Sequence, residues 1–508
     1  MKKYSVIFLI LILVINIIDS GMLNIYATIT KENDEVSIIN IDFSSDWYDG
    51  KFVGRWESYH SQDTGNIIAY FNQLRNPSMG TFQGSWYGSN DNSTRELRGF
   101  FVGRILFGKL IQGSENLAFC GIISPNTPNS EINLYCFNIG LIKITGTYES
   151  SFLPHLTGEY GIGVQTFHLI DRNRSENFTK NIVDDFREMM IQIWYPTADY
   201  NFTPNIKYMD YKTFQWLKGR SPIPLVTIPN NAYTYVNPHG HKNAPIAETE
   251  RCYPVIIFSH GYDGVYQIYT SLIEDIVSNG FIVVSINHPY IAGITVFPDG
   301  RNIYVSAIPS DNINAELWRS IALRSVVDDA KFVLTEIEKM NSTHSDFMGY
   351  FDLSKVGMYG HSFGGGATAI CCYEDERFKV GLTLDGFFST DNIPNGIKKP
   401  FLMLMAESRI NQDPYFNDTW DNFTSNAYAI WINGSEHYSF TDVGILLKHL
   451  LPTIPPIFLG FGTLDPKRMI NITRSLEIEF FRAYLKGGSI ESLKETLLKF
   501  PEILVKSK

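Results

Sequence analysis

The pattern of apolar and polar positions changes near residue 158. Downstream of that point, short, fully apolar runs alternate with stretches whose apolar residues recur at helical spacing. Residues 255–258 and 281–286 are such runs, and residues 266–278 between them have the helical pattern. Strands that are apolar at every position are typical of a sheet covered on both faces. The alternation therefore predicts a mostly parallel sheet between two layers of helices.

The alternation continues towards the C-terminus. Apolar residues at helical spacing from 323 to 337 predict a long amphipathic helix, and residues 356–359 predict the strand after it. Further short apolar runs predict strands at residues 381–384, 401–405 and 428–432. A last amphipathic helix at residues 474–485 is expected to close the domain, before a lysine-rich tail. We therefore assign residues 158–508 to one α/β domain.

A different unit recurs between residues 42 and 157, in which a glycine stands between two bulky residues with one residue on each side of it. Copies of the unit begin at Phe52, Phe82, Leu97, Phe101, Phe119, Ile144 and Leu156. Alternating bulky and small residues indicate short antiparallel strands, and the glycines leave room for aromatic rings. We expect an all-β Gly/aromatic repeat domain, built as a β-meander or a small β-solenoid. Its aromatic residues are expected to form the core of a thin sheet rather than a binding ladder for a sugar or polymer.

The N-terminus has the order of segments found in an export signal. Two lysines precede an apolar run at residues 6–18, which is shorter than the ~20 residues of a membrane-spanning helix. Residues 1–27 are therefore predicted to be a signal peptide, cleaved after Ser20 or after Ala27. An uncleaved membrane anchor is the alternative. Both predict a secreted or cell-surface protein.

Composition removes several function classes. The 508 residues carry a net charge of −11, with 44% hydrophobic and 19% charged residues, which is typical of globular proteins. The negative charge argues against nucleic acid or an anionic membrane as the main partner. The five cysteines form no Cys-x-x-Cys pair and no cluster with histidine, so no metal and no cofactor are expected. Cys120 and Cys136 are spaced to join neighbouring strands, and export would permit a disulfide between them.

Candidate chemistry centres on Gly360-His361-Ser362-Phe363-Gly364, which lies between a short apolar run and a small-residue helical pattern. This context places the serine at a sharp strand-to-helix turn, where Cβ atoms on both sides would not fit. The turn exposes the hydroxyl and places the next backbone N–H at a helix start, where developing negative charge is favoured. The pattern is short enough to arise by chance, but its surroundings indicate a serine nucleophile.

A serine hydroxyl needs a base to take its proton and a carboxylate to orient that base. The only histidines downstream of the serine are His437 and His449. His437 follows the last expected strand in a turn-rich loop and is favoured as the base, whereas His449 lies in an apolar run. Asp385 ends the strand after the serine unit, and Glu407 and Asp413 follow the strand beyond it. Spacing alone does not choose among these three acids.

Further motifs occur in a fixed order. They are Ile-Phe-Ser-His-Gly at 257–261, Gly-Phe-Ile-Val-Val at 280–284, Asn-His-Pro-Tyr at 287–290, Phe-Pro-Asp-Gly-Arg at 297–301, Gly-His-Ser-Phe-Gly-Gly at 360–365, Leu-Asp-Gly at 384–386 and His-Tyr-Ser-Phe-Thr-Asp at 437–442. With this set the chain resembles the platelet-activating-factor acetylhydrolase family of α/β-hydrolases (the plasma type, also called lipoprotein-associated phospholipase A2) over residues 158–487. The β-rich repeat lies outside the resemblance.

The resemblance implies Ser362 as nucleophile, His437 as base and Asp385 as acid, with an oxyanion hole formed by the backbone N–H groups of Phe363 and Tyr262. It implies an exported, metal-independent serine esterase that works through an acyl-enzyme. The implied substrates are small esters with short or oxidised acyl chains, including the sn-2 position of phospholipids such as platelet-activating factor. Apolar, proline-rich segments at 201–250 and 446–465 are candidates for a lid or for a rim that contacts a lipid surface transiently.

The chain departs from the family at one point. After Ser-His-Gly the family usually has Leu-Gly, whereas this chain has Tyr262-Asp263. A carboxylate aimed into the hole would oppose the oxyanion, so activity requires Asp263 to point elsewhere, and Tyr262 is expected to narrow the acyl pocket. Among the other histidines, His361 is expected to face away from the serine and to support the site by hydrogen bonds. His260 and His288 are expected to have structural roles, although both lie where they could line the site.

Two other functions fit parts of the sequence. A cutinase- or polyester-type hydrolase has a similar nucleophile turn, and an aromatic β-module could hold a polymer, but that group is usually more compact. A surface binding protein with an inactive hydrolase domain is the alternative from another class, and the intact set of Ser362, Asp385 and His437 weighs against it. The sequence does not identify a ligand of the β-rich repeat.

Overall fold

The chain forms two compact units, Met1–Phe152 and Leu153–Lys508. The computed structural model describes residues 14–17, 23–29, 37–41, 50–58, 64–73, 79–88, 94–102, 105–112, 115–124, 130–136, 140–150, 153–179, 182–198, 203–220, 233, 236–386, 393–409, 416–421, 423–450 and 456–508. The predicted signal peptide at residues 1–27 lies largely outside this part of the chain and stays a prediction.

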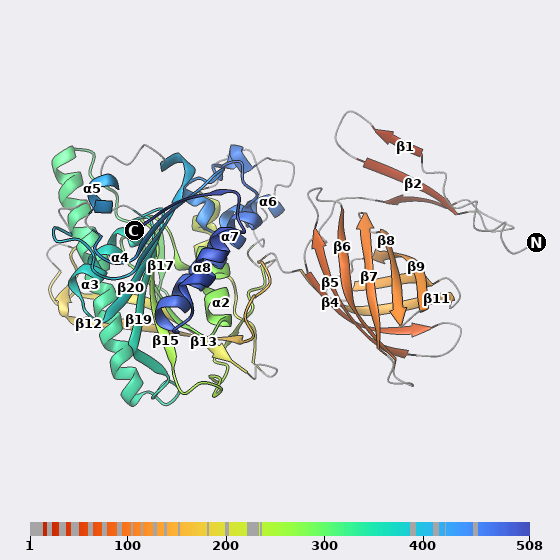
Figure 1. Ribbon diagram of the computed structural model, residues 1–508, viewed down its shortest axis with the longest axis horizontal. Helices are drawn as coiled ribbons and strands as arrows, with labels where there is room; N and C mark the ends of the chain where they lie inside the picture. The colour runs from red at the N-terminus through yellow and green to blue at the C-terminus, as the bar shows by residue number, and fades with distance from the viewer. Residues whose placement is uncertain are drawn as a thin grey trace, which may run out of the picture. The chain divides into compact units, whose positions relative to one another are not determined.

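The first unit consists of antiparallel strands. β1 (Val14–Ile17), β2 (Leu23–Ile29) and β3 (Ser37–Ile41) form one small sheet. In a second sheet each strand pairs with its neighbour in the chain, and the last strand pairs with the first, so this sheet closes on itself (Figure 1). Its strands are β4 (Gly50–Ser58), β5 (Thr64–Gln73), β6 (Met79–Gly88), β7 (Thr94–Val102), β8 (Ile105–Gln112), β9 (Glu115–Ser124), β10 (Ser130–Cys136) and β11 (Gly140–Ser150).

Glycines in the closed sheet stand opposite aromatic rings. Gly99 pairs with Phe82, and a Cβ atom added to Gly99 would lie 2.3 Å from the Phe82 ring. Gly108 pairs with Phe119 in the same way, at 2.5 Å from its ring. The two rings are buried, with centroids 6.0 Å apart. Each glycine therefore leaves a space on its strand, and an aromatic ring from the neighbouring strand fills that space.

The expectation of a disulfide between Cys120 and Cys136 is wrong, because the thiol of Cys120 is free. The register explains why. Cys120 lies opposite Tyr135 on the neighbouring strand, and Cys136 lies opposite Phe119. Sequence spacing brought the two cysteines onto adjacent strands but not into the same pair.

The second unit is built on a ten-stranded mixed sheet in the order β14-β12-β13-β16-β15-β19-β20-β21-β22-β23. Its six central strands, from β16 to β22, are all parallel. The strands are β12 (Gly161–Ser175), β13 (Phe186–Thr197), β14 (Gly240–Lys242), β15 (Tyr253–Ser259), β16 (Ile282–Asn287), β19 (Phe351–His361), β20 (Phe378–Leu384), β21 (Phe401–Ala406), β22 (Ala427–Ile432) and β23 (Ile503–Ser507). A separate hairpin joins β17 (Ile294–Val296) and β18 (Asn302–Tyr304).

Helices cover both faces of this sheet (Figure 1). Successive residues of β15 alternate between two cores: Val255 and Ile257 pack in the core that contains residues of α3 and α4, and Ile256 and Phe258 pack in the core of α2 and α7. The prediction of a mostly parallel sheet between helical layers is confirmed. The helices are α1 (Tyr211–Lys218), α2 (Thr270–Ser278), α3 (Asn312–Thr343), α4 (Phe363–Glu374), α5 (Phe416–Asp421), α6 (Val443–Leu450), α7 (Pro466–Leu485) and α8 (Ile490–Leu497).

The C-terminal end differs from the prediction. The last long helix, α7, begins at Pro466 because Asp465 caps its first backbone N–H groups, so it starts well before residue 474. The lysine-rich stretch is not a tail, since it forms α8 and then β23, which pairs antiparallel with β22 at the sheet edge. Exposed lysines are common on edge strands because they discourage pairing with other chains. Within the described residues, no helix has the length and apolar character needed to cross a membrane.

Candidate active site

The serine lies at a strained turn between β19 and α4. Ser362 has φ 53° and ψ −113°, a conformation that L-residues rarely adopt. Neighbouring glycines make the turn fit: a Cβ on Gly360 would lie 2.4 Å from the Gly364 backbone, and one on Gly364 would lie 2.2 Å from the carbonyl oxygen of Ser259. The sequence predicted that this turn needs glycines, and the structure shows why: the backbone segments approach too closely for Cβ atoms at these positions.

The structure brings the expected base and acid to this serine. His437 lies in the loop after β22, and its Nε2 is 2.9 Å from the Ser362 hydroxyl oxygen. Its Nδ1 is 2.5 Å from Oδ2 of Asp385, which follows β20 directly with a positive φ of 44°. The three side chains come from three different strand ends, which meet at the carboxyl edge of the parallel sheet. The arrangement can pass a proton from a serine hydroxyl to an imidazole that a carboxylate holds in place.

The carboxylate of Asp385 is almost fully buried and well supplied with donors. Its Oδ1 accepts from the backbone N–H of Ala406 at 3.0 Å, and its Oδ2 accepts from Nε of Arg409 at 3.2 Å as well as from His437. Burial by itself would raise the pKa of Asp385. The hydrogen bond and charge of His437, the Ala406 N–H and the Arg409 charge outweigh burial and hold this pKa below its usual value. Arg409 was missed in the sequence, where only its position just after β21 marked it.

Of the other candidate acids, Glu407 does not bond the base. Glu407 instead accepts a hydrogen bond from the backbone N–H of Gly434 at 2.6 Å, so it braces the loop that carries His437. Asp413 lies outside the described residues. His449 lies on α6, and its side chain is also outside the described part of the chain.

The expected oxyanion donors belong to two segments that meet at the serine. Phe363 is the first residue of α4, where a backbone N–H has no partner within the helix. Tyr262 follows Gly261, and a Cβ on Gly261 would be only 3.0 Å from Cβ of Ser362, so this loop runs directly against the nucleophile. The Tyr262 side chain is held by a hydrogen bond from its hydroxyl to the Ser306 carbonyl oxygen (3.0 Å) and by an edge contact with Trp318.

Asp263 does point elsewhere. It adopts a positive φ of 57°, and its carboxylate forms an ion pair with Arg220, whose guanidinium also lies over the Trp216 ring. The departure from the family's usual Leu-Gly is therefore accompanied by a partner that holds the carboxylate. The partner lies far away in the sequence, so no local signal revealed it.

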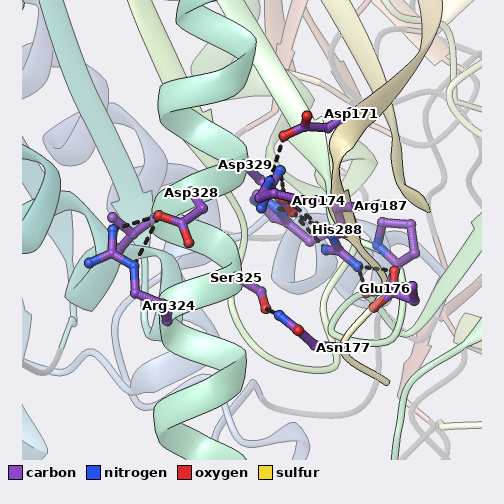
Figure 2. Close-up of polar contacts among 12 residues, drawn as sticks. Asp171, Arg174, Glu176, Asn177, Arg187, His288, Arg324, Ser325, Asp328 and Asp329 are labelled. Atoms are coloured by element: carbon purple, nitrogen blue, oxygen red, sulfur yellow. Dashed lines mark hydrogen bonds and ion pairs between the residues drawn. The ribbon is translucent and has the colours of Figure 1, made fainter. Parts of the chain in front are cut away.

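His260 and His288 are completely buried and have structural roles. His288 contacts Asp329 through Nδ1 at 2.8 Å and the Ser259 hydroxyl through Nε2 at 3.1 Å. Figure 2 shows the network around Asp329, in which Arg187 lies between Asp329 and Glu176. Burial lowers the pKa of His288, and Asp329 compensates only in part.

His361 is buried and hydrogen-bonded, as expected, but it does not turn away from the site. Its ring centroid lies 4.6 Å from that of His437, and its Nε2 bonds the His437 carbonyl oxygen at 2.9 Å. Strand alternation predicted the wrong surroundings because the His437 loop folds back over the turn.

A Ser–His–Asp line at the carboxyl edge of a mostly parallel sheet, with a strained serine before a helix, defines an α/β-hydrolase. The family model for "Platelet-activating factor acetylhydrolase, isoform II" matches residues 145–302 and 319–491. The chain belongs to this family, and it is a carboxylic ester hydrolase.

Individual relatives are distant. A platelet-activating factor acetylhydrolase of Cavia porcellus is 23% identical over 327 residues, which cover 58% of this chain and 72% of the relative. A probable 1-alkyl-2-acetylglycerophosphocholine esterase of Arthroderma benhamiae is 30% identical over 269 residues, or 49% of this chain and 65% of its own. Among solved structures, a ferulic acid esterase from Streptomyces cinnamoneus shares the fold with a TM-score of 0.58 and 24% identity, covering 70% of this chain and 98% of that one.

Proposed function

We propose that the enzyme hydrolyses its esters through an acyl-enzyme on Ser362. The observation that carries the proposal is the line Asp385–His437–Ser362, with separations of 2.5 and 2.9 Å. His437 Nε2 takes the hydroxyl proton as the oxygen attacks the ester carbonyl carbon, and then gives it to the leaving alcohol. Water repeats the two steps and releases the acid. Asp385 holds the imidazole and stabilises its charged form.

The negative charge that develops on the carbonyl oxygen would be bound by the backbone N–H groups of Phe363 and Tyr262. The position of Phe363 at a helix start and the approach of Gly261 to Ser362 support this assignment. Because backbone donors serve as the oxyanion hole, the proposed reaction needs neither a metal ion nor another cofactor.

The proposed substrates are small esters with short or oxidised acyl chains, such as those at the sn-2 position of phospholipids. The relatives named for platelet-activating factor support a phospholipid with an acetyl group. A tyrosine at position 262, fixed by Ser306 and Trp318, is a bulky wall where the family usually has leucine. Replacing it by leucine should shift the preferred acyl chain towards greater length.

We also propose that the enzyme is exported, with residues 1–27 as the signal, and that the β-rich repeat predicted over residues 42–157 forms a module that ends at Phe152 and is separate from the catalytic unit. The apolar side chains of Ile457 and Phe458, which are 53% and 73% exposed, support transient contact of the catalytic unit with a lipid surface. N-terminal sequencing of the protein from the culture medium would test the signal and its cleavage site.

The function is tested with p-nitrophenyl acetate, butyrate, octanoate and dodecanoate, in the presence of EDTA. Rapid turnover of the short esters that disappears in Ser362→Ala would support the proposal. Platelet-activating factor and a phospholipid with a long sn-2 chain would then define the substrate class. No turnover, together with no labelling of the wild type by a fluorophosphonate, would overturn the proposal in favour of a surface binding protein.

A further inference from the structure

Hydrogen bonds and close contacts connect the loop that carries the base to the loop that carries an oxyanion donor. We call residues 433–442 the base loop and residues 260–264 the oxyanion loop. At one end, Nε2 of His361 contacts the carbonyl oxygen of His437 at 2.9 Å. A carbonyl oxygen only accepts, so Nε2 carries a hydrogen. Burial, followed by the charge of His437, lowers the pKa of His361 to about 3, so the ring is neutral and its Nδ1 is a bare acceptor.

The direction of the remaining hydrogen bond follows from this tautomer. Nδ1 of His361 lies 2.9 Å from the hydroxyl of Tyr269, which must therefore donate to it. Burial raises the pKa of Tyr269, and the nearby backbone N–H of Gly261 lowers it in part. A Cβ atom added to Gly264 would lie 3.6 Å from the same phenol oxygen, so the hydroxyl packs against the oxyanion loop. The line runs from the Tyr269 hydroxyl, which packs against the oxyanion loop, through the His361 ring to the His437 carbonyl. Each donor in this line has one acceptor, so the direction of neither hydrogen bond can be reversed without breaking a bond.

The other side of Gly261 is held too. Its carbonyl oxygen accepts from Gly264 N–H at 3.0 Å and lies 2.7 Å from Nδ1 of His260. His260 accepts the backbone N–H of His288 at Nε2 (3.2 Å), so Nδ1 is the nitrogen that donates. The Gly261 carbonyl and the Tyr262 N–H belong to one planar peptide and point in opposite directions. Fixing the carbonyl therefore fixes the direction of the proposed oxyanion donor.

We propose that Tyr269 and His361 are positioning residues, which hold the oxyanion loop and the base loop at a fixed distance on either side of Ser362. The proposal rests on the function proposed above. Serine, base and oxyanion donor lie on three separate segments, and transition-state stabilisation needs them placed to within about 0.5 Å. The hydroxyl of Tyr269 bonds the His361 ring and packs against the oxyanion loop.

The proposed positioning role of the Tyr269 hydroxyl can be tested separately from the packing of its ring. The ring is buried against Phe258, at 4.9 Å between centroids, and Tyr269→Phe keeps that contact while it removes the hydroxyl. The matched control is Tyr359→Phe. Tyr359 is equally buried and touches the same Phe258 ring at 4.9 Å, but its hydroxyl donates to Glu477, away from both loops.

The experiment compares kcat, KM and inhibition by a trifluoromethyl ketone in wild type, Tyr269→Phe and Tyr359→Phe, with active enzyme counted by fluorophosphonate labelling. In Tyr269→Phe, kcat per labelled site should fall about 10- to 100-fold and KM should change less than about threefold. The ketone forms a tetrahedral adduct with an oxyanion, so its Ki should rise by the same factor as kcat/KM falls. Tyr359→Phe should lose comparable stability and keep all three values within about twofold.

A second pair of variants tests the other end of the line. His361→Gln keeps an N–H donor for the His437 carbonyl, whereas His361→Phe keeps only the ring shape. Activity per labelled site should be several-fold higher in the glutamine variant. Equal activity of these two variants, or unchanged kcat and ketone Ki in Tyr269→Phe, would overturn the proposal. Neither result would touch the proposed function, which depends on the difference between wild type and Ser362→Ala.

Discussion

Among the described residues of the catalytic unit, two lines of serine, histidine and aspartate have nearly the same hydrogen bonds. In Ser362–His437–Asp385 the separations are 2.9 and 2.5 Å, and in Ser259–His288–Asp329 they are 3.1 and 2.8 Å. The surroundings differ. The His437 side chain is 30% exposed and its serine lies at a strained turn before a helix, whereas His288 is fully buried and Ser259 lies within strand β15.

The two acids differ as well. Asp385 is hydrogen-bonded to the base and to one arginine, Arg409, at 3.2 Å. Asp329 is bound by Arg187 and Arg174, which, with His288, hold its pKa far below the usual range despite burial (Figure 2). Its charge is already neutralised, so it can give little help to a developing imidazolium. Hydrogen-bond geometry alone thus does not set the proposed nucleophile apart; exposure, the strained turn before a helix and a carboxylate with fewer cationic partners do.

The largest expected effect comes from removing each serine hydroxyl. Ser362→Ala should lower kcat for p-nitrophenyl acetate by about 10⁴-fold or more, because no nucleophile remains. Ser259→Ala should leave kcat within about threefold, since that hydroxyl is out of reach of any substrate. Steady-state kinetics on both variants checks this, and loss of fluorophosphonate labelling in Ser259→Ala would contradict the assignment.

Removing each carboxylate charge should separate catalysis from stability. Asp385→Asn should lower kcat by about 10⁴-fold with a modest change in unfolding free energy, because the base loses its orientation. Asp329→Asn should instead cost about 3–5 kcal/mol of stability, because Arg187 and Arg174 both lose this buried carboxylate and Arg187 keeps only Glu176. Urea unfolding and kinetics per folded enzyme measure the two effects. The comparison would fail if Asp329→Asn were the variant with intact stability and lost activity.

As the pH falls, the folded protein should lose stability first through its buried neutral histidines, and only at lower pH through its paired carboxylates. Burial lowers the pKa of His260 to about 3, against about 6.5 in the unfolded chain. Between these two pH values the unfolded state therefore binds more protons than the folded state. The contribution of His260 to the free energy of unfolding is complete above pH 6.5 and is lost as the pH falls. From pH 6.5 to 5 the loss should be about 2 kcal/mol from this residue. Urea unfolding at the two pH values should show a smaller difference in His260→Gln; an equal difference would refute the assignment.

The smallest effect concerns a third paired carboxylate. Arg220→Ala should free the carboxylate of Asp263 within the oxyanion loop and lower kcat/KM about three- to tenfold, since a carboxylate near the oxyanion opposes it. Asp263→Gly should change kcat/KM less than about threefold, because glycine accepts the positive φ and the carboxylate is already held away. The double variant should resemble Asp263→Gly. If Arg220→Ala lowers kcat/KM equally with and without Asp263, the arginine acts by another route.

The sequence predicted the features that depend on local pattern, such as strands and the serine turn. It missed the contacts between residues that are far apart in the chain. Apolar runs such as residues 255–258 predicted buried parallel strands, and the glycines around Ser362 predicted its turn. The choice of Asp385 over Glu407 needed the family resemblance, because both residues follow a strand and only the fold shows which one reaches His437. Arg409 gave no signal, since a single arginine after a strand is ordinary.

Longer-range contacts were less predictable still. Nothing in the sequence places Asp329, in the middle of α3, beside His288 and Arg187. The lysine-rich end was interpreted as a tail because an exposed edge strand has few apolar residues. A shift of one residue in strand register moves a side chain to the other face of a sheet, and a difference of one residue separates Cys120 from the position opposite Cys136. The register therefore rules out a disulfide between the two cysteines.

The edge strand β23 ties the extreme end of the described chain to the chemistry. Beside its pairing with β22, the carbonyl of Glu502 accepts the N–H of Asn433, the first residue after β22 on the way to His437. A protease that cut between α8 and β23 would leave every residue of the triad in the protein and still release this brace. Such a clip would act as an off-switch, and any shortened version of the enzyme should retain residues 502–508.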